Sequence, residues 1–223
     1  MGRQLTQKAL KKLNELVASG VPFKDAMAQA AAWEEASVSV PSAPKPPVKP
    51  TTTLAEATER IDAILAELRD AGVVPDEPGN GCSPEEIATL ERDTKRSLPY
   101  AYKHLLTHVG KARTRLISHD HIAFELHRLR AMQNKGAAFM ARGGFEKPPN
   151  AFFLLSALGD AYHYMSCDDP DAVDAAIWVA REDLDAPFLA YPSILDLVQS
   201  LSDDAFRAWN SGYFKAHPQG TQA

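Results

Sequence analysis

The sequence predicts an α+β fold with N-terminal helices, a central antiparallel sheet and a C-terminal helix, plus an extra helical hairpin on a proline-rich linker. Apolar residues recur at helical spacing through residues 54–110, whereas short runs of strand length follow between residues 151 and 181. The proline-rich stretch separates the first residues from the rest. We therefore expect a hairpin (1–36), a linker (37–53), a main domain (54–210) and a tail (211–223).

The hairpin consists of two predicted helices. The first runs to about Ala18 and ends at Ser19-Gly20, and the second begins at Pro22. The linker that follows, SVSVPSAPKPPVKPTTT, contains five prolines and favours extended conformations that bury no core. Because two short helices enclose little apolar volume, we expect the hairpin to need a partner or the main domain for stability.

Helix signals open the main domain. Apolar residues at helical spacing predict a helix over TLAEATERIDAILAELRDAGV, with Gly72 as its stop. Ser83-Pro84, with Glu86 three residues after the serine, predicts a capped helix start. Pro99 cannot continue that helix but suits the start of the next, so Leu98-Pro99 predicts a corner. We expect Gly110 to end the third helix in a left-handed conformation.

Strand signals follow. TRLISH predicts a short strand and DHIAFELHRLRAMQN a helix capped by Asp120. AFFLLSA, AYHYMS and AAIWVAR predict three further strands, and alternation in the second places Tyr162 and Tyr164 on one face. PSILDLVQSLSDDAFRAWNSGY predicts one or two closing helices.

Charge and composition exclude several classes of function. The net charge is −5, but residues 1–50 carry seven basic and four acidic residues, so the remainder carries −8. We therefore expect no direct nucleic-acid binding by the main domain and a better match to a basic protein partner. No apolar run approaches the roughly 18 residues that cross a bilayer, so no membrane association is expected. Cys82 and Cys167 lie far apart, which favours a reducing cytoplasm.

Two groups of residues are candidates for metal binding or catalysis. His104 and His108 lie four residues apart and could chelate a metal, with His119 and His121 as further ligands. Zinc needs three or four converging ligands, which the sequence alone does not bring together, so we expect no metal. Asp160 and His163 form a possible acid–base pair, but the sequence has no recognisable nucleophile, metalloprotease or phosphate-loop motif. We therefore expect neither a catalytic site nor a cofactor.

A set of short motifs runs in order along roughly residues 54–205. They are Ser83-Pro84-Glu85-Glu86-Ile87, Leu90-Glu91, Leu98-Pro99, Tyr102-Lys103, Leu105-Leu106, Gly110, Leu158-Gly159-Asp160-Ala161-Tyr162, Ile177-Trp178-Val179 and a closing Tyr191–Leu201 helix. In the order and spacing of these motifs, the main domain resembles the SUKH superfamily, the Smi/Knr-type proteins.

This resemblance implies a non-catalytic immunity protein that neutralises a cognate toxin of a bacterial polymorphic toxin system, such as a nuclease, by direct binding. The alternative is an intracellular regulatory scaffold that recruits partners through its N-terminal arm. Asp168, Asp169 and Asp171 are the candidate contacts to a basic toxin, unless they are only solvated turn residues. Tyr100 and Tyr162 are candidate aromatic anchors of the same interface.

Overall fold

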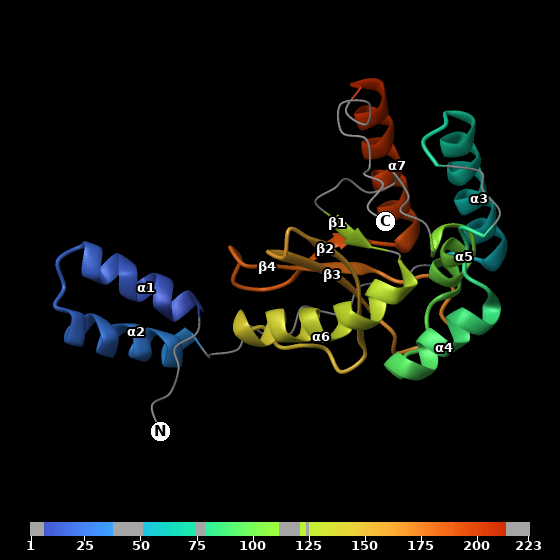
Figure 1. Cartoon of the computed structure of the whole chain (residues 1–223). Coiled ribbons are helices and arrows are strands. Elements are labelled where there is room, and N and C mark those ends of the chain that lie inside the picture. The colour runs from blue at the N-terminus through green and yellow to red at the C-terminus, as the bar shows by residue number, and fades with distance from the viewer. Residues whose placement is uncertain (1–6, 38–50, 75–78, 112–120, 124, 213–223) are drawn as a thin grey trace.

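The computed structural model describes residues 7–37, 51–74, 79–111, 121–123 and 125–212 (Figure 1). Their elements confirm the α+β fold, with the sheet between N-terminal and C-terminal helices. In chain order they are α1 (Gln7–Ala18), α2 (Phe23–Ser37), α3 (Leu54–Asp70), α4 (Pro84–Thr94), α5 (Tyr100–Val109), β1 (His121–Ala123), α6 (Leu126–Arg142), β2 (Ala151–Ala157), β3 (Ala161–Ser166), β4 (Ile177–Arg181), β5 (Phe188–Tyr191) and α7 (Ile194–Asn210).

The sheet is an antiparallel meander whose order, β1-β2-β3-β4-β5, follows the chain. Helices cover both of its faces (Figure 1). Phe152, Met165 and Ile177 pack with α3, α5 and α7 in the larger core. Phe153 and Tyr164 pack against α6 on the other face. A register shift between Phe153 and Leu155 locally breaks the strict alternation along β2.

Two helices, α4 and α3, begin with a capping box. Ser83 accepts from the backbone N–H of Glu86, whose carboxylate accepts from the Ser83 N–H, so the predicted capping box is confirmed. Thr53 and Glu56 form a second capping box at the start of α3. The apolar residues at helical spacing along α3 are buried: Ala57, Ile61, Ile64, Leu65 and Leu68. Gly72 has the left-handed backbone that ends this helix.

The Leu98-Pro99 corner is confirmed, because α4 ends at Thr94 and Pro99 occupies the N-cap of α5. The backbone N–H groups of Tyr100 and Ala101 donate to the carbonyls of Ala172 and Val173, at 2.9 and 2.8 Å. The first turn of α5 is thereby tied to the chain between β3 and β4.

Gly110 ends α5 for a different reason from the one predicted. Its φ of −75° is right-handed, so conformational freedom is not what the position needs. A Cβ atom there would clash with Cys82 Sγ and lie 2.7 Å from the carbonyl oxygen of Leu106. The absence of a side chain lets the chain around Cys82 pack directly on the end of the helix.

Two further predictions need correction. Residues 121–123 form β1, which pairs with β2 from His121 opposite Ala157 to Ala123 opposite Leu155, so α6 begins only at Leu126. Residues 188–191 form β5, so the closing helix begins at Ile194 and not at Tyr191. Both are short strands that are held by pairing with a neighbouring strand, and their few residues carry little pattern of their own. The expected strand TRLISH and cap Asp120 lie outside the described residues.

Helices α1 and α2 pack on each other around a core of their own. Leu13, Ala26 and Ala30 are buried in it, with Leu16 and Val21 packed alongside. Several large apolar side chains of the pair stay exposed: Leu10, Val17, Phe23 and Met27. Within the described part of the chain, no helix combines the length and apolar character needed to span a bilayer.

Candidate functional site

Asp62, His104 and His108 converge at the surface between α3 and α5. Oδ1 of Asp62 lies 2.8 Å from Nε2 of His104 and 3.4 Å from Nε2 of His108. One ligand atom from each of the three residues lies within 4.8 Å of the other two. We call these residues the histidine cluster.

The side chains of the histidine cluster project from the solvent-facing sides of α3 and α5. His104 and His108 lie one turn apart, and their rings meet edge to face with centroids 4.9 Å apart. Tyr100 stacks on His104 at 5.8 Å and 7°, and its hydroxyl lies 2.9 Å from Oγ1 of Thr58 on α3. A tyrosine that bridges both helices therefore fixes the plane of the His104 ring.

Arg69 determines the proton position on His108. Its guanidinium lies 3.3 Å from Nδ1 of His108, and because guanidinium only donates, Nδ1 accepts and Nε2 carries the proton toward Asp62. Burial lowers the pKa of His108, and the nearby His104 and Arg69 lower it further, while Asp62 opposes them. His108 is therefore neutral at physiological pH.

The donor set of the cluster suits a divalent cation, since two imidazole nitrogens and one carboxylate oxygen lie on one side of the helix pair. The sequence spacing predicted the histidine pair but not Asp62, which lies 42 positions before His104. His119 and the side chain of His121 lie outside the described residues.

Asp168, Asp169 and Asp171 lie together on the connection between β3 and β4. Asp168 accepts from Nδ2 of Asn150 at 2.6 Å and from the Ser166 hydroxyl. Asp169 accepts from the backbone N–H of Asp171 at 3.0 Å, an Asx turn. These carboxylates therefore shape the connection, while Asp168 and Asp171 remain exposed to solvent.

A second group of carboxylates lies at the opposite end of the sheet. The β2–β3 and β4–β5 turns meet there, where the backbone N–H of Glu182 donates to the carbonyl of Asp160 at 3.0 Å. The group, which we call the acidic end, consists of the exposed Asp160, Glu182, Asp183 and Asp185, and Arg181 pairs with Asp183 within it. The connection that carries Asp168, Asp169 and Asp171 lies at the other end of the sheet from this group.

Leu158 lies beside the acidic end in an unfavourable conformation. Leu158 and Gly159 both have positive φ, 49° and 87°, as a tight hairpin turn requires. Glycine adopts such angles readily, but leucine does so at a cost. The Leu158 side chain is 75% exposed, so burial does not compensate the strain.

The two tyrosines predicted to be partner anchors have different positions. Tyr100 is partly buried and bonded within the α3–α5 pair, as described above. Tyr162 is only 7% exposed and packs on Phe139 with ring centroids 4.9 Å apart, so its expected surface role is wrong. The alternation of side chains along β3 places Tyr162 on the face that α6 covers, and not toward solvent. His163, the other half of the possible acid–base pair, lies within β3 opposite Leu155 of β2 and Val179 of β4.

The two cysteines are buried free thiols. Burial raises the pKa of Cys82 to about 11 and the pKa of Cys167 to about 12. Both are therefore protonated at neutral pH, and a protonated thiol is a poor nucleophile.

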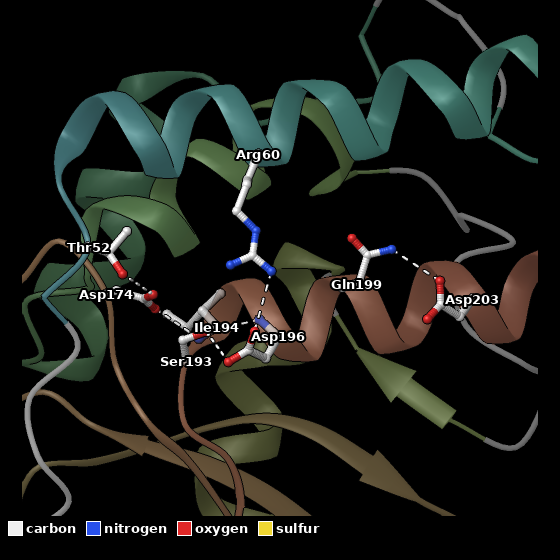
Figure 2. Close-up of polar contacts among 8 residues, drawn as sticks. All are labelled: Thr52, Arg60, Asp174, Ser193, Ile194, Asp196, Gln199 and Asp203. Atoms are coloured by element: carbon white, nitrogen blue, oxygen red, sulfur yellow. Dashed lines mark hydrogen bonds and ion pairs between the residues drawn. The ribbon is translucent and has the colours of Figure 1, made fainter.

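Asp174 is a buried carboxylate at the junction of three segments, and its role was not foreseen (Figure 2). Its Oδ1 accepts from the backbone N–H groups of Ala175 and Ile194, at 2.7 and 2.8 Å, and its Oδ2 accepts from Thr52 at 3.1 Å. Burial raises its pKa, and these hydrogen bonds offset part of that rise. Asp174 thereby joins the residue next to the α3 cap to the start of α7.

No known family model matches this chain, and no curated protein sequence matches it significantly.

Proposed function

We propose that the protein is a non-catalytic immunity protein that binds a basic toxin and acts in the cytoplasm. The observation that carries this proposal is the acidic end, where exposed Asp160 and Glu182 lie beside the strained and exposed Leu158. Carboxylates at this position raise the rate of encounter with a basic surface, and an exposed apolar side chain supplies contact area. The SUKH-like order of motifs supports the same assignment.

The environments of the reactive side chains support a binding role over catalysis. The two thiols are buried and protonated, and the carboxylate of Asp174 is bonded to the backbone of two segments. His163 is enclosed by neighbouring strands. Each of these groups stabilises the fold where it lies.

Co-expression with the toxin encoded beside the gene is the direct test. We expect the two proteins to co-purify and the protein to restore growth of cells that produce the toxin. Failure of both with the neighbouring toxin would contradict the immunity assignment.

Two sets of neutral variants locate the interface. Asp160→Asn, Glu182→Gln and Asp185→Asn together remove charge from the acidic end, and Asp168→Asn, Asp169→Asn and Asp171→Asn remove it from the opposite end. Asn can still accept the turn hydrogen bonds, so the fold is preserved. We expect the first set to lower the association rate and weaken its salt dependence. A change confined to the second set would move the interface to the β3–β4 connection.

A regulatory scaffold is the second candidate, favoured by the hairpin. Its exposed apolar residues, among them Phe23 and Val17, surround a core of only a few buried side chains. Phe23→Ser combined with Val17→Ser would abolish partner binding by a scaffold while leaving toxin rescue by an immunity protein intact. Partner binding that is lost in this variant, with no toxin rescue by either the wild type or the variant, would favour the scaffold.

A further inference from the structure

We propose that Asp62, His104 and His108 form a binding site for one divalent transition-metal ion of the zinc class. The site would be held by three protein ligands from α3 and α5, with solvent completing the coordination. It is independent of the partner-binding role. His104 and His108 alone are too few ligands, and the fold supplies a third in Asp62.

The separations between ligand atoms fit such an ion. Neighbouring ligands of a tetrahedral zinc ion with bonds of about 2.0–2.1 Å lie about 3.3–3.4 Å apart. Asp62 Oδ1 is 3.4 Å from His108 Nε2 and 2.8 Å from His104 Nε2. Shifts of about half an ångström would give tetrahedral spacing for both of these pairs.

The ligands stand on a rigid support. Ile61 beside Asp62 and Leu105 beside His104 are fully buried in the larger core, so the two helix backbones are fixed relative to each other. Tyr100 holds the His104 ring by stacking and is itself bonded to Thr58. Sites on packed helices keep their geometry better than sites on loops, which lowers the cost of assembling the ligands.

The site is also accessible. The side chain of Asp62 is 50% exposed and that of His108 is 29% exposed, so an ion can enter and water can fill the fourth position. Asp62 contributes one negative charge, and the histidines bind as neutral rings, so the ion keeps a net positive charge at the surface.

Arg69 opposes metal binding in a way that can be measured. A histidine that binds metal through Nε2 carries its proton on Nδ1 and donates it to an acceptor. In His108 that nitrogen faces the Arg69 guanidinium, which is itself a donor. Arg69 must therefore move aside when the ion binds. Replacing it with glutamine, whose side-chain oxygen can accept from Nδ1–H, should strengthen binding.

Titration of the chelator-treated full chain with zinc chloride tests the proposal. We expect one ion per chain, and affinities lower by about tenfold or more for Asp62→Asn and His108→Gln. Arg69→Gln should bind more tightly than the wild type. His127→Ala, a change at a well exposed histidine on α6, is the matched control and should bind as the wild type does.

A second measurement distinguishes the loss of metal binding from a general loss of folding in the variants. Zinc should raise the thermal midpoint of the wild type but not that of Asp62→Asn, since only the native site binds the ion. Cobalt should give visible absorption bands in the wild type that His108→Gln lacks. Wild-type affinity retained in both Asp62→Asn and His108→Gln would overturn the site. An unchanged or weaker affinity in Arg69→Gln would overturn the placement of the ion on Nε2 of His108.

Discussion

The carboxylate of Asp174 accepts a hydrogen bond of 2.8 Å from the backbone N–H of Ile194, the first residue of α7. The same oxygen accepts from the N–H of Ala175, so one buried atom satisfies two backbone donors. Ser193, the N-cap of α7, binds the N–H of Asp196, and Asp196 in turn pairs with Arg60 of α3 at 3.3 Å (Figure 2). The start of α7 is thus secured by a chain of polar contacts.

Two substitutions of Asp174 distinguish the effect of its hydrogen bonds on stability from the effect of its charge. Asp174→Asn can keep all three hydrogen bonds without burying a charge, so we expect stability at pH 7 equal to or above that of the wild type. Asp174→Ala leaves two buried N–H groups unsatisfied and should cost about 2–5 kcal/mol. Urea unfolding of both variants measures these differences, and equal losses in both would show that the charge itself stabilises the fold.

The Asp174 variants should also differ in their pH dependence. The pKa of Asp174 is raised above its ordinary value of 3.8, so on acidification the folded protein takes up this proton before the unfolded chain does. The contribution of Asp174 to stability is therefore greatest below pH 3.8 and is lost as the pH rises through the folded pKa. The stability advantage of Asp174→Asn over the wild type should accordingly shrink as the pH falls. Unfolding measured at pH 7 and pH 4 tests the sign.

Leu158→Asn should raise the free energy of unfolding by about 1 kcal/mol, because asparagine tolerates positive φ better than leucine. Leu158→Ala keeps the Cβ atom that causes the strain, so it is the matched control and should change stability little. If Leu158 contacts the partner, both variants should weaken binding. A stabilised Leu158→Asn variant with unchanged affinity would remove Leu158 from the interface.

Gly81→Ala should destabilise the protein severely, because the added Cβ would overlap the carbonyl of Thr107 and lie 3.0 Å from the backbone nitrogen of His108. Backbone atoms cannot move aside as a flexible side chain can. Gly144→Ala meets open space and costs only the strain of its φ of +70°, about 1 kcal/mol. Chemical denaturation compares the two, and similar losses would contradict the steric explanation.

The thiols of Cys82 and Cys167 should react slowly with a disulfide reagent at pH 8 in the native protein. Burial blocks access, and the raised pKa values keep both thiols protonated at that pH. Both should react rapidly in denaturant. Rapid reaction of either thiol before unfolding would show that its surroundings open readily.

Local signals predicted the elements that depend on neighbouring residues. The Ser83 capping box, the Pro99 corner and the buried face of α3 follow from spacing within one helix. β1 and β5 were missed, because strands of three and four residues carry little pattern and are held by pairing with a neighbouring strand. Gly110 was interpreted by its usual conformational role, whereas close packing against Cys82 explains it.

For the candidate sites, too, the local spacing could be predicted from the sequence, whereas contacts between separate elements could not. The spacing of His104 and His108 was visible in the sequence, but Asp62 was one of many polar residues on the exposed side of a helix. Asp174 is not among the candidates from the sequence, because nothing local indicates that its carboxylate will meet the backbone of Ile194. Tyr162 was misjudged because alternation separates two faces of a strand without showing that both are covered.

The strand order has a consequence for how the protein is made. Each strand pairs with its neighbour in the chain, so the sheet can grow strand by strand during synthesis. Helix α3 is synthesised before the sheet, and one of its main packing partners, α7, is synthesised after it. Helix α5 can cover its part of α3 early, but the part of α3 that packs on α7 stays uncovered until α7 leaves the ribosome. A chain stopped before α7 would expose that part to chaperones and proteases.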